Sequence, residues 1–372
     1  MRIHIIGSKG IPSSSVPGAG GIERHVEQLA KGLSEKGNRV FVYTRSHSEY
    51  DKLTWNGVRL IRLPSIRTKN LEAISHTFLS TLHVLFQDTD IIHYHGVGPS
   101  TLAWIPRLFK RKAKTVCTFH NRDWFDSKWS KPAKLYLRFG EWCAVRFPHA
   151  TIAVSHTIQV FCRTKFKKEV HYIPNGADMP GPQGTSELAA FGLEPNNYLL
   201  GVGRLLPRKA YDIAIEAYRR VPGDMPLVIV GEATHEGDYA EKLHALAAKD
   251  PRVRLLGYQS GQALKQLFAH CYAFVHPSQA EGLSVSIIEA MASAKVVIMS
   301  NIEENLELVD HSGLAFETDN IDALRKAYEL VLSDPEMVEQ RGKRAREVAR
   351  REYSWSRVID KTDALFKDLI QT

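Results

Sequence analysis

The sequence predicts an α/β protein built from two doubly wound domains. Short apolar runs alternate with helical patterns from the first residue onward, which is typical of parallel sheets wound with helices. The chain has 372 residues, enough for two separate hydrophobic cores. A Pro- and Gly-rich segment, residues 180–184, indicates a linker. We expect one domain over residues 1–180 and a second over 185–352, with a final helix over 355–372 folding back on the first.

Strands are expected where apolar runs end in polar or glycine-containing turns. In the first domain these runs are residues 3–6, 40–43, 58–63, 91–93, 116–119 and 151–154. In the second domain one run ends at Gly203, and the others are residues 227–230, 253–256, 273–275 and 296–299. Ligands of such sheets bind beyond the carboxyl ends of the strands, so the residues that follow these runs are candidates for a site.

Composition and charge limit the class of protein. Hydrophobic residues make up 44% of the chain, yet no apolar run approaches the roughly 20 residues that span a bilayer. The opening segment is too short for a signal peptide, so we expect a cytoplasmic protein. The four cysteines lack C-x-x-C spacing and are expected to be reduced core residues rather than metal ligands.

The net charge of +8 is unevenly distributed. Residues 1–180 hold 27 basic and 13 acidic residues, a net +14, whereas the remainder holds 22 and 28, a net −6. A basic half beside an acidic half indicates that the basic half meets an anionic surface.

The most informative stretch runs from His276 to Met299. Its apolar strand ends before Pro277, a loop follows, and Ser284 is a plausible N-cap for a helix with apolar residues at helical spacing. A loop that opens into a helix after a strand is an anion site. Glu281 in the loop and Glu289 in the helix would be repelled by phosphate, so we expect them to bind hydroxyl groups.

This stretch resembles the E-x7-E motif of the retaining nucleotide-sugar glycosyltransferases of family 4, also called group 1. The matching residues are Ser278, Glu281, Gly282, Glu289, Ala290, Met291, Ala292, Val297 and Ile298. The resemblance implies that Glu289 holds ribose hydroxyls. It also implies that Glu281 contacts the donor sugar, together with backbone N–H groups of Gly282, Leu283 and Ser284.

A second motif, Gly203-Arg204-Leu205-Leu206-Pro207-Arg208-Lys209, resembles the family's G-R-L-x-x-x-K-G pattern. The resemblance implies that Arg204 and Lys209 hold the nucleotide diphosphate. Breaking a sugar–phosphate bond builds negative charge on the leaving group, which preorganised cations stabilise. The strand tips at Gly231 and at Tyr258 are expected to edge the nucleotide pocket.

The first domain holds a third candidate site at Gly20-Gly21, which open a helix after the first strand. The segment is not G-x-G-x-x-G, which argues against a dehydrogenase. It resembles the family's G-G-x-E-x-x-V motif, in which the backbone of the glycines contacts donor phosphate or an anionic acceptor.

Polar residues follow two further strands of the first domain. His93 and His95 could bind a metal, but the sequence offers no evident third ligand, so we expect His95 to line the acceptor site instead. His120 resembles the family histidine that contacts the donor sugar. Arg122 and Asp123 either bind acceptor or pair with each other.

Residues 124–139 interleave aromatic residues with Lys and Arg, and residues 107–114 add a second basic run. Such segments suit an anionic lipid interface. The alternatives are a helix packed on its own domain with a solvated basic face, and a groove for single-stranded nucleic acid. No nucleic-acid recognition motif appears, so we expect membrane contact and no nucleic acid.

The resemblance covers nearly the whole chain and implies the GT-B architecture, in which two Rossmann-like domains face each other across a cleft and a C-terminal helix crosses back to the first. It implies a hexosyltransferase that retains anomeric configuration and needs no metal or cofactor, with the leaving phosphate taking the acceptor proton. The opening segment resembles sugar transferases of bacterial surface-polysaccharide pathways, rhamnosyltransferases among them. We therefore expect a glycan or lipid-linked acceptor and peripheral contact with a membrane.

The sequence also departs from the family pattern. Ala210 and Ala294 replace glycines, Val296 replaces a proline, and Glu303-Glu304 replace a small turn near the donor site. These changes leave open a non-catalytic nucleotide-sugar-binding subunit, or a nucleotide-sugar epimerase on the same fold.

Overall fold

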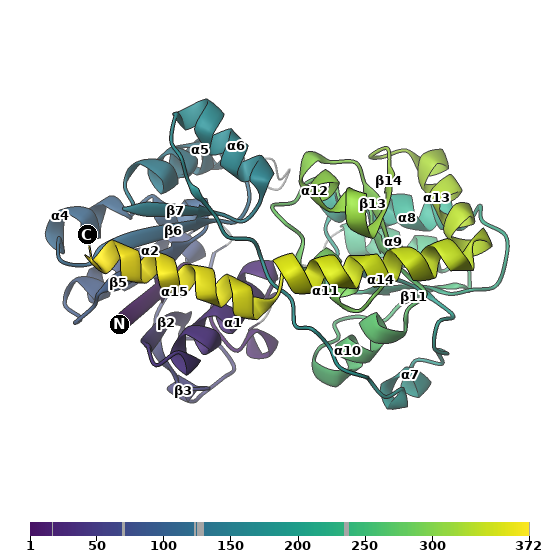
Figure 1. Ribbon diagram of the computed structural model, residues 1–372, viewed down its shortest axis with the longest axis horizontal. Helices are drawn as coiled ribbons and strands as arrows, with labels where there is room; N and C mark the ends of the chain where they lie inside the picture. The colour runs from purple at the N-terminus through teal and green to yellow at the C-terminus, as the bar shows by residue number, and fades with distance from the viewer. Residues whose placement is uncertain (17, 69–70, 123, 125–129, 234–237, 372) are drawn as a thin grey trace. The chain divides into compact units, whose positions relative to one another are not determined.

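The computed structural model describes residues 1–371 except 17, 69–70, 123, 125–129 and 234–237. The chain divides into two compact units (Figure 1). The N-terminal unit comprises Met1–Asn175 and Trp355–Thr372, and the C-terminal unit comprises Gly176–Ser354. The division therefore falls a few residues before the expected linker and directly before the expected final helix.

The N-terminal unit is built on an eight-stranded sheet in the order β3-β4-β2-β1-β5-β6-β7-β8. All neighbours are parallel except the short β3, which pairs antiparallel with β4. The strands are β1 (Arg2–Ile6), β2 (Arg39–Arg45), β3 (Thr54–Trp55), β4 (Val58–Leu63), β5 (Ile91–His95), β6 (Lys114–Phe119), β7 (Ala150–Ala153) and β8 (His171–Tyr172). The six predicted strands are confirmed, whereas β3 and β8 are two-residue pairings with no pattern of their own.

The helices of this unit are α1 (Gly21–Glu35), α2 (Glu72–Leu85), α3 (Val97–Ser100), α4 (Trp104–Phe109), α5 (Lys131–Arg146) and α6 (His156–Phe166), with a 3-10 turn η1 (Ser13–Ser15). The predicted face of α1 is confirmed, because Val26, Leu29 and Leu33 are buried against the core.

The final helix α15 (Trp355–Gln371) packs with this unit as predicted. Trp355, Val358 and Phe366 join the core formed by β1, β2 and α1. Gly32 of α1 marks the close approach, because a Cβ there would lie 2.1 Å from Cδ1 of Ile359.

The C-terminal unit has an all-parallel six-stranded sheet in the order β11-β10-β9-β12-β13-β14. Its strands are β9 (Leu199–Val202), β10 (Leu227–Val230), β11 (Val253–Leu255), β12 (Ala273–His276), β13 (Val297–Ser300) and β14 (Gly313–Phe316). This is the 3-2-1-4-5-6 order of dinucleotide-binding domains, in which ligands bind where the strand order reverses. The reversal lies between β9 and β12.

The helices of the C-terminal unit are α7 (Ser186–Ala190), α8 (Tyr211–Tyr218), α9 (Asp238–Ala247), α10 (Gly261–His270), α11 (Val285–Ala292), α12 (Glu303–Ser312), α13 (Ile321–Ser333) and α14 (Pro335–Glu352), with a 3-10 turn η3 (Pro207–Lys209). Its core joins β9, β10 and β12 to α8 and α13.

Two further expectations concern the chain as a whole. All four cysteines are buried and unpaired, as predicted. Among the described residues, no helix combines the length and apolarity required to cross a membrane.

Candidate active site

The C-terminal unit brings its two sequence motifs together at the reversal of strand order. Lys209 ends the turn that follows β9, and Glu281 lies in the loop that follows β12. The Lys209 ammonium donates a hydrogen bond to Oε1 of Glu281, although the residues are 72 positions apart. His276, the last residue of β12, also contacts Oε1 of Glu281, at 3.0 Å from its Nε2. These three side chains form the anchor cluster of the site.

The anchor cluster is almost entirely shielded from solvent. The side chains of Lys209 and Glu281 are 11% and 10% exposed, and that of His276 is fully buried. Burial opposes ionisation of Glu281, but Lys209, His276 and Arg208 together hold the pKa of that carboxyl well below its usual range. Burial lowers the pKa of Lys209, and the Glu281 carboxylate opposes that shift. An ionised Glu281 therefore keeps a cation beside it.

The loops around the anchor cluster are tied to one another. Arg208 donates from its guanidinium to the carbonyl of Ala280 (3.1 Å) and accepts at its own carbonyl from the Gln279 N–H (2.8 Å). Gly203, which precedes Arg204, has no room for a side chain, because a Cβ would lie 2.9 Å from the Tyr211 hydroxyl. The glycine of the motif thus lets the Arg204 loop pass close to α8.

Helix α11 carries the remaining residues of the E-x7-E motif. Gly282, Leu283 and Ser284 are buried immediately before its first turn, and Glu289 lies in its second turn, partly exposed. Ser284 occupies the N-cap position as predicted, but its hydroxyl makes no capping bond and instead contacts that of Ser286 at 3.0 Å. The capping role predicted for its side chain is therefore wrong.

Several buried polar atoms around the anchor cluster lack a hydrogen-bond partner. They are the Tyr211 hydroxyl, Nδ1 of His276, the Ser278 hydroxyl and Oδ1 of Asn305. Buried polar groups are normally satisfied, so these four atoms are candidates for contact with a bound ligand. Sequence reasoning did not select His276, Tyr211 or Ser278 as site residues. His276 ends the strand before the motif, and Tyr211 is the second residue after Lys209, so position alone could have indicated both.

The other C-terminal candidates lie at the same edge of the sheet. Tyr258 follows β11 and is half exposed. Glu303 and Glu304 form the first turn of α12, where carboxylates interact favourably with the helix dipole. The departure from the family's small turn therefore has a local structural reason.

In the N-terminal unit, Gly20 and Gly21 begin α1 as expected. The N–H of Gly20 donates to Oε2 of Glu23 (2.8 Å), and the N–H of Lys9 donates to Oε1 of the same carboxylate (3.1 Å). Glu23 thus caps the start of α1, and the expected contact of Gly20 and Gly21 with an anionic ligand stays a prediction.

His95 and His120 lie side by side with a histidine that sequence reasoning did not connect to them. Nδ1 of His95 is 2.9 Å from Nε2 of His120. The ring of His25, from α1, lies 4.8 Å from that of His120 and 5.4 Å from that of His95. The pair considered in the sequence was His93 and His95, whereas the structure groups His95 with His25 and His120, whose ring nitrogens all lie within 4.8 Å of one another.

Arg122 stacks on aromatic rings, with its guanidinium 4.3 Å from the ring centre of Phe161. Asp123 lies outside the described residues, so the expectation that it binds acceptor or pairs with Arg122 stays a prediction.

The basic aromatic segment both packs on its own domain and exposes an apolar surface. Trp124 donates from its indole to the buried Glu141 (2.8 Å), and the Arg138 guanidinium covers its ring at 4.0 Å. Residues 125–129 of this segment lie outside the described residues. Leu137, Gly140 and Cys143 of α5 face the core, whereas Leu135 and Phe139 are 70% and 51% exposed.

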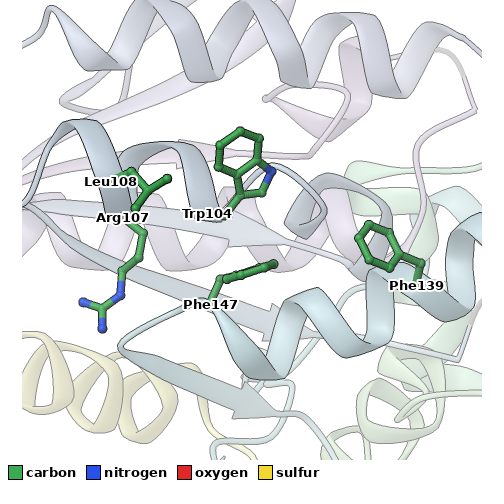
Figure 2. A pocket seen from close by; sticks show the side chains of 5 residues that line it. All are labelled: Trp104, Arg107, Leu108, Phe139 and Phe147. Carbon is green, nitrogen blue, oxygen red and sulfur yellow. The ribbon is translucent and has the colours of Figure 1, made fainter.

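Helices α4 and α5 share this exposed surface. Figure 2 shows Trp104, Leu108, Phe139 and Phe147 around a hollow, with the Arg107 guanidinium directed away from the rings. We call this the apolar–basic face. Besides the residues that line the hollow, we include in it the exposed residues next to them in sequence, on α4, in the turn after it and in the first half of α5. These are Phe109, Arg111, Lys112, Lys131 and Leu135, with the half-buried Lys134.

Comparison with solved structures gives the fold class. Sucrose-phosphate synthase from Thermosynechococcus elongatus superposes with a TM-score of 0.85 at 21% identity, covering 100% of this chain and 99% of that one. The Anabaena protein Alr3699/HepE in complex with UDP-glucose gives a TM-score of 0.80 at 21% identity over 99% and 100% of the two chains. The chain has the GT-B architecture of two Rossmann-like domains.

Sequence comparison gives the family. The model for Glycosyltransferase Family 4 matches residues 19–179, and that for Glycosyl transferases group 1 matches residues 187–348. The chain belongs to the group 1 glycosyltransferases of family 4, as its motifs predicted.

Two curated relatives extend the comparison. An uncharacterized glycosyltransferase from Methanocaldococcus jannaschii, MJ1178, is 21% identical over 96% of this chain and 97% of its own length. The second is the N-acetylgalactosamine-N,N'-diacetylbacillosaminyl-diphospho-undecaprenol 4-alpha-N-acetylgalactosaminyltransferase of Campylobacter jejuni. It is 23% identical over 67% of this chain and 68% of its own length.

Proposed function

We propose that this glycosyltransferase moves a hexose from a nucleotide-diphosphate sugar to a glycan or lipid-linked acceptor with retention, in the synthesis of bacterial cell-envelope polysaccharide. The observation that carries the proposal is the anchor cluster, where Lys209, Glu281 and His276 meet at the reversal of strand order. A donor bound there meets a buried cation on one loop and a carboxylate on the other.

Each residue has a distinct part in the proposed reaction. Lys209 and Arg204 bind the diphosphate and stabilise the charge that builds on the leaving phosphate. Glu281 orients Lys209 and accepts a hydrogen bond from a donor-sugar hydroxyl. Glu289 binds the ribose hydroxyls, and His120 contacts the sugar.

We further propose that the reaction needs no metal ion. Two basic side chains and the N-terminus of α11 supply the positive charge that a metal would bring. The proton of the acceptor hydroxyl then passes to the leaving phosphate on the same face of the sugar, which keeps the anomeric configuration.

The relatives support the acceptor class. The Campylobacter jejuni relative is named for a diphospho-undecaprenol substrate, and HepE was solved with UDP-glucose. A UDP-hexose donor and a polyprenyl-diphosphate-linked acceptor are therefore the first pair to test.

The test begins with thermal shifts in UDP-, GDP-, dTDP- and ADP-sugars, because a ligand that binds only the folded state raises the Tm. The donor that shifts the Tm is then assayed for transfer in EDTA, and NMR assigns the product's anomeric configuration. Lys209→Met is expected to lower kcat by about 10²–10³-fold, the cost of losing one preorganised oxyanion donor. The control is Arg325→Met, which removes a partly exposed ion pair in the same unit. Binding without turnover would instead support a non-catalytic subunit.

A further inference from the structure

We propose that His276 is a positioning residue, which turns the Glu281 carboxylate so that its second oxygen, Oε2, accepts a hydrogen bond from a hydroxyl of the donor sugar. The inference rests on the proposed function and deepens it, because it names the side chain that prepares the site for the sugar rather than for the diphosphate. His276 acts through Glu281 and needs no contact of its own with the donor.

Two hydrogen-bond donors from neighbouring strand ends meet at one oxygen of Glu281. Nζ of Lys209 and Nε2 of His276 both contact Oε1, the histidine at 3.0 Å. Among the residues that the structure describes, none is hydrogen-bonded to Oε2. The last torsion of a glutamate side chain has a broad range when nothing restrains it. Because two donors hold Oε1, this torsion is fixed, and the direction of Oε2 is fixed with it.

The histidine is the more rigid of the two donors. It ends β12, which pairs with β13 through His276 and Met299. Its ring is fully buried and lies nearly parallel to that of Phe274, at an interplanar angle of 19°. Lys209, in contrast, carries its ammonium on a flexible four-carbon stem. We therefore assign the orientation of the carboxylate to His276.

The tautomer of the ring follows from its partner. An ionised carboxylate only accepts hydrogen bonds, so the proton of the neutral ring must be on Nε2. Burial and the neighbouring Lys209 lower the pKa of His276, which keeps the ring neutral at pH 7. Nδ1 is then unprotonated, and it is buried without a hydrogen-bond partner among the described residues.

This tautomer separates a positioning role from a role in stability alone. A buried polar atom without a partner lowers stability. Leucine, which has a similar size, would fill the same space without the unpartnered Nδ1, and Lys209 would still pair with Glu281. Leucine would however remove the N–H that holds Oε1, so it is the informative substitution.

The first test compares two probes by titration calorimetry. They are the nucleotide sugar that raises the Tm most in the panel above and the nucleoside diphosphate with the same base. His276→Leu should weaken binding of the nucleotide sugar by about 10–100-fold, the range for a hydrogen bond to a charged group, with diphosphate binding unchanged within about twofold.

Two variants are the controls for this comparison. His276→Gln, whose amide N–H can replace that of Nε2, should bind both probes like the wild-type protein. His270→Leu removes a histidine of the same unit that contacts the carbonyls of Gln183 and Gly184, and it should also bind both probes normally.

A double-mutant cycle tests whether His276 acts through Glu281. In a Glu281→Ala background, His276→Leu should weaken binding of the nucleotide sugar no further. A measurement on the wild-type protein does not depend on the folding of His276→Leu. Nitrogen-15 NMR of the labelled histidine rings at pH 7, with the signals of His276 assigned by their loss in His276→Gln, should show Nε2 protonated and Nδ1 unprotonated.

The outcomes separate this inference from the function on which it rests. Equal loss of affinity for both probes in His276→Leu, additive effects in the cycle, or a proton on Nδ1 would overturn the positioning role and leave the proposed transfer reaction in place. If no nucleotide sugar binds the wild-type protein, the proposed function itself fails, and the positioning role fails with it.

Discussion

At the scale of single residues, the anchor cluster carries the functional argument. A buried ion pair is weak support for stability, because desolvation offsets most of its attraction. Lys209 and Glu281 are nevertheless held together with less than an eighth of either side chain exposed. We interpret Lys209 as a preorganised cation. Glu281 keeps it charged until the phosphate of a donor binds.

Two residues that depart from the family pattern have left-handed backbone conformations. Ala210 has φ +51° and Ala294 has φ +59°, at positions where the family has glycine. Backbone strain at such a position lowers the stability of a non-glycine residue by about 1–2 kcal/mol. Glycine avoids this strain but lowers stability by about 0.4–1 kcal/mol, because it makes the unfolded chain more flexible. Each Ala→Gly change is therefore expected to stabilise the C-terminal unit by about 0.5–1 kcal/mol in urea denaturation. Ala189→Gly in α7, where φ is helical, should instead destabilise it by up to about 1 kcal/mol. Equal effects at all three positions would contradict this account.

The strand-end residues were the part of the site that sequence could predict. Arg204, Lys209, Glu281 and Glu289 follow apolar runs, and parallel strands bring such ends to one edge. The sequence could not show that His276 and Tyr211 close around Glu281, because strand-end and helix-start positions do not specify which side chains meet. It could not connect His25 to His95 and His120 either, since the three come from separate elements.

At the scale of elements, regular patterns were predictable and close packing was not. The apolar strands of both sheets were found, but β14 was missed because Gly313–Phe316 is a short run without alternation. The packing of α5 was similarly ambiguous, since its sequence interleaves aromatic and basic residues. Only the structure separates the residues that face the core from those that face outward.

The contact between α14 and the end of α11 depends on one glycine. A Cβ on Gly342 would lie 2.2 Å from the carbonyl oxygen of Ala294, a backbone atom that cannot rotate away. Although alanine favours helix, Gly342→Ala should destabilise the protein by about 1–3 kcal/mol, the range for overpacking. Gly181→Ala, where no atom lies within 4 Å, should be neutral or slightly stabilising. Chemical denaturation compares them, and a stabilised Gly342→Ala variant would show that α14 shifts freely.

At the scale of the whole molecule, the N-terminal unit concentrates buried neutral histidines. Burial lowers the pKa of His4, His25 and His76 to about 4, and that of His93 to about 3. These groups take up protons on unfolding below pH 6.5, so stability is full above that pH and is lost as the pH falls toward 4. A histidine whose pKa is about 6.5 in the unfolded chain and about 4 in the folded protein lowers the free energy of unfolding by about 1.4 kcal/mol at pH 5.5, relative to its value at high pH.

Acid sensitivity should therefore diminish when one of these histidines is removed. The difference in unfolding free energy between pH 7 and pH 5.5 is expected to shrink by about 1.2 kcal/mol in His76→Gln. The exposed His171→Gln should leave the difference unchanged. Denaturation curves at the two pH values provide the measurement, and an unaltered pH dependence in His76→Gln would refute the assignment.

The uneven charge of the chain and the apolar–basic face lead to the last prediction. The N-terminal 180 residues carry a net +14, and the face adds exposed apolar side chains to that charge. Hydrophobic insertion combined with attraction to anionic lipid is a known mode of peripheral binding. We propose that this face contacts an anionic membrane, where a lipid-linked acceptor would lie.

Neutralising the charge of this face should weaken binding to anionic vesicles but leave the weak binding to neutral ones unchanged. In the triple variant Arg111→Gln, Lys112→Gln, Lys134→Gln, each substitution should weaken the free energy of membrane binding by about 1 kcal/mol. The affinity at low salt should then fall by up to about 100-fold. A control with the same charge change neutralises three exposed basic residues of the C-terminal unit: Lys265, Lys326 and Arg344. Sedimentation with phosphatidylglycerol–phosphatidylcholine and pure phosphatidylcholine vesicles compares the proteins. If both triple variants lose affinity equally, net charge alone governs binding, and the apolar–basic face is not the contact surface.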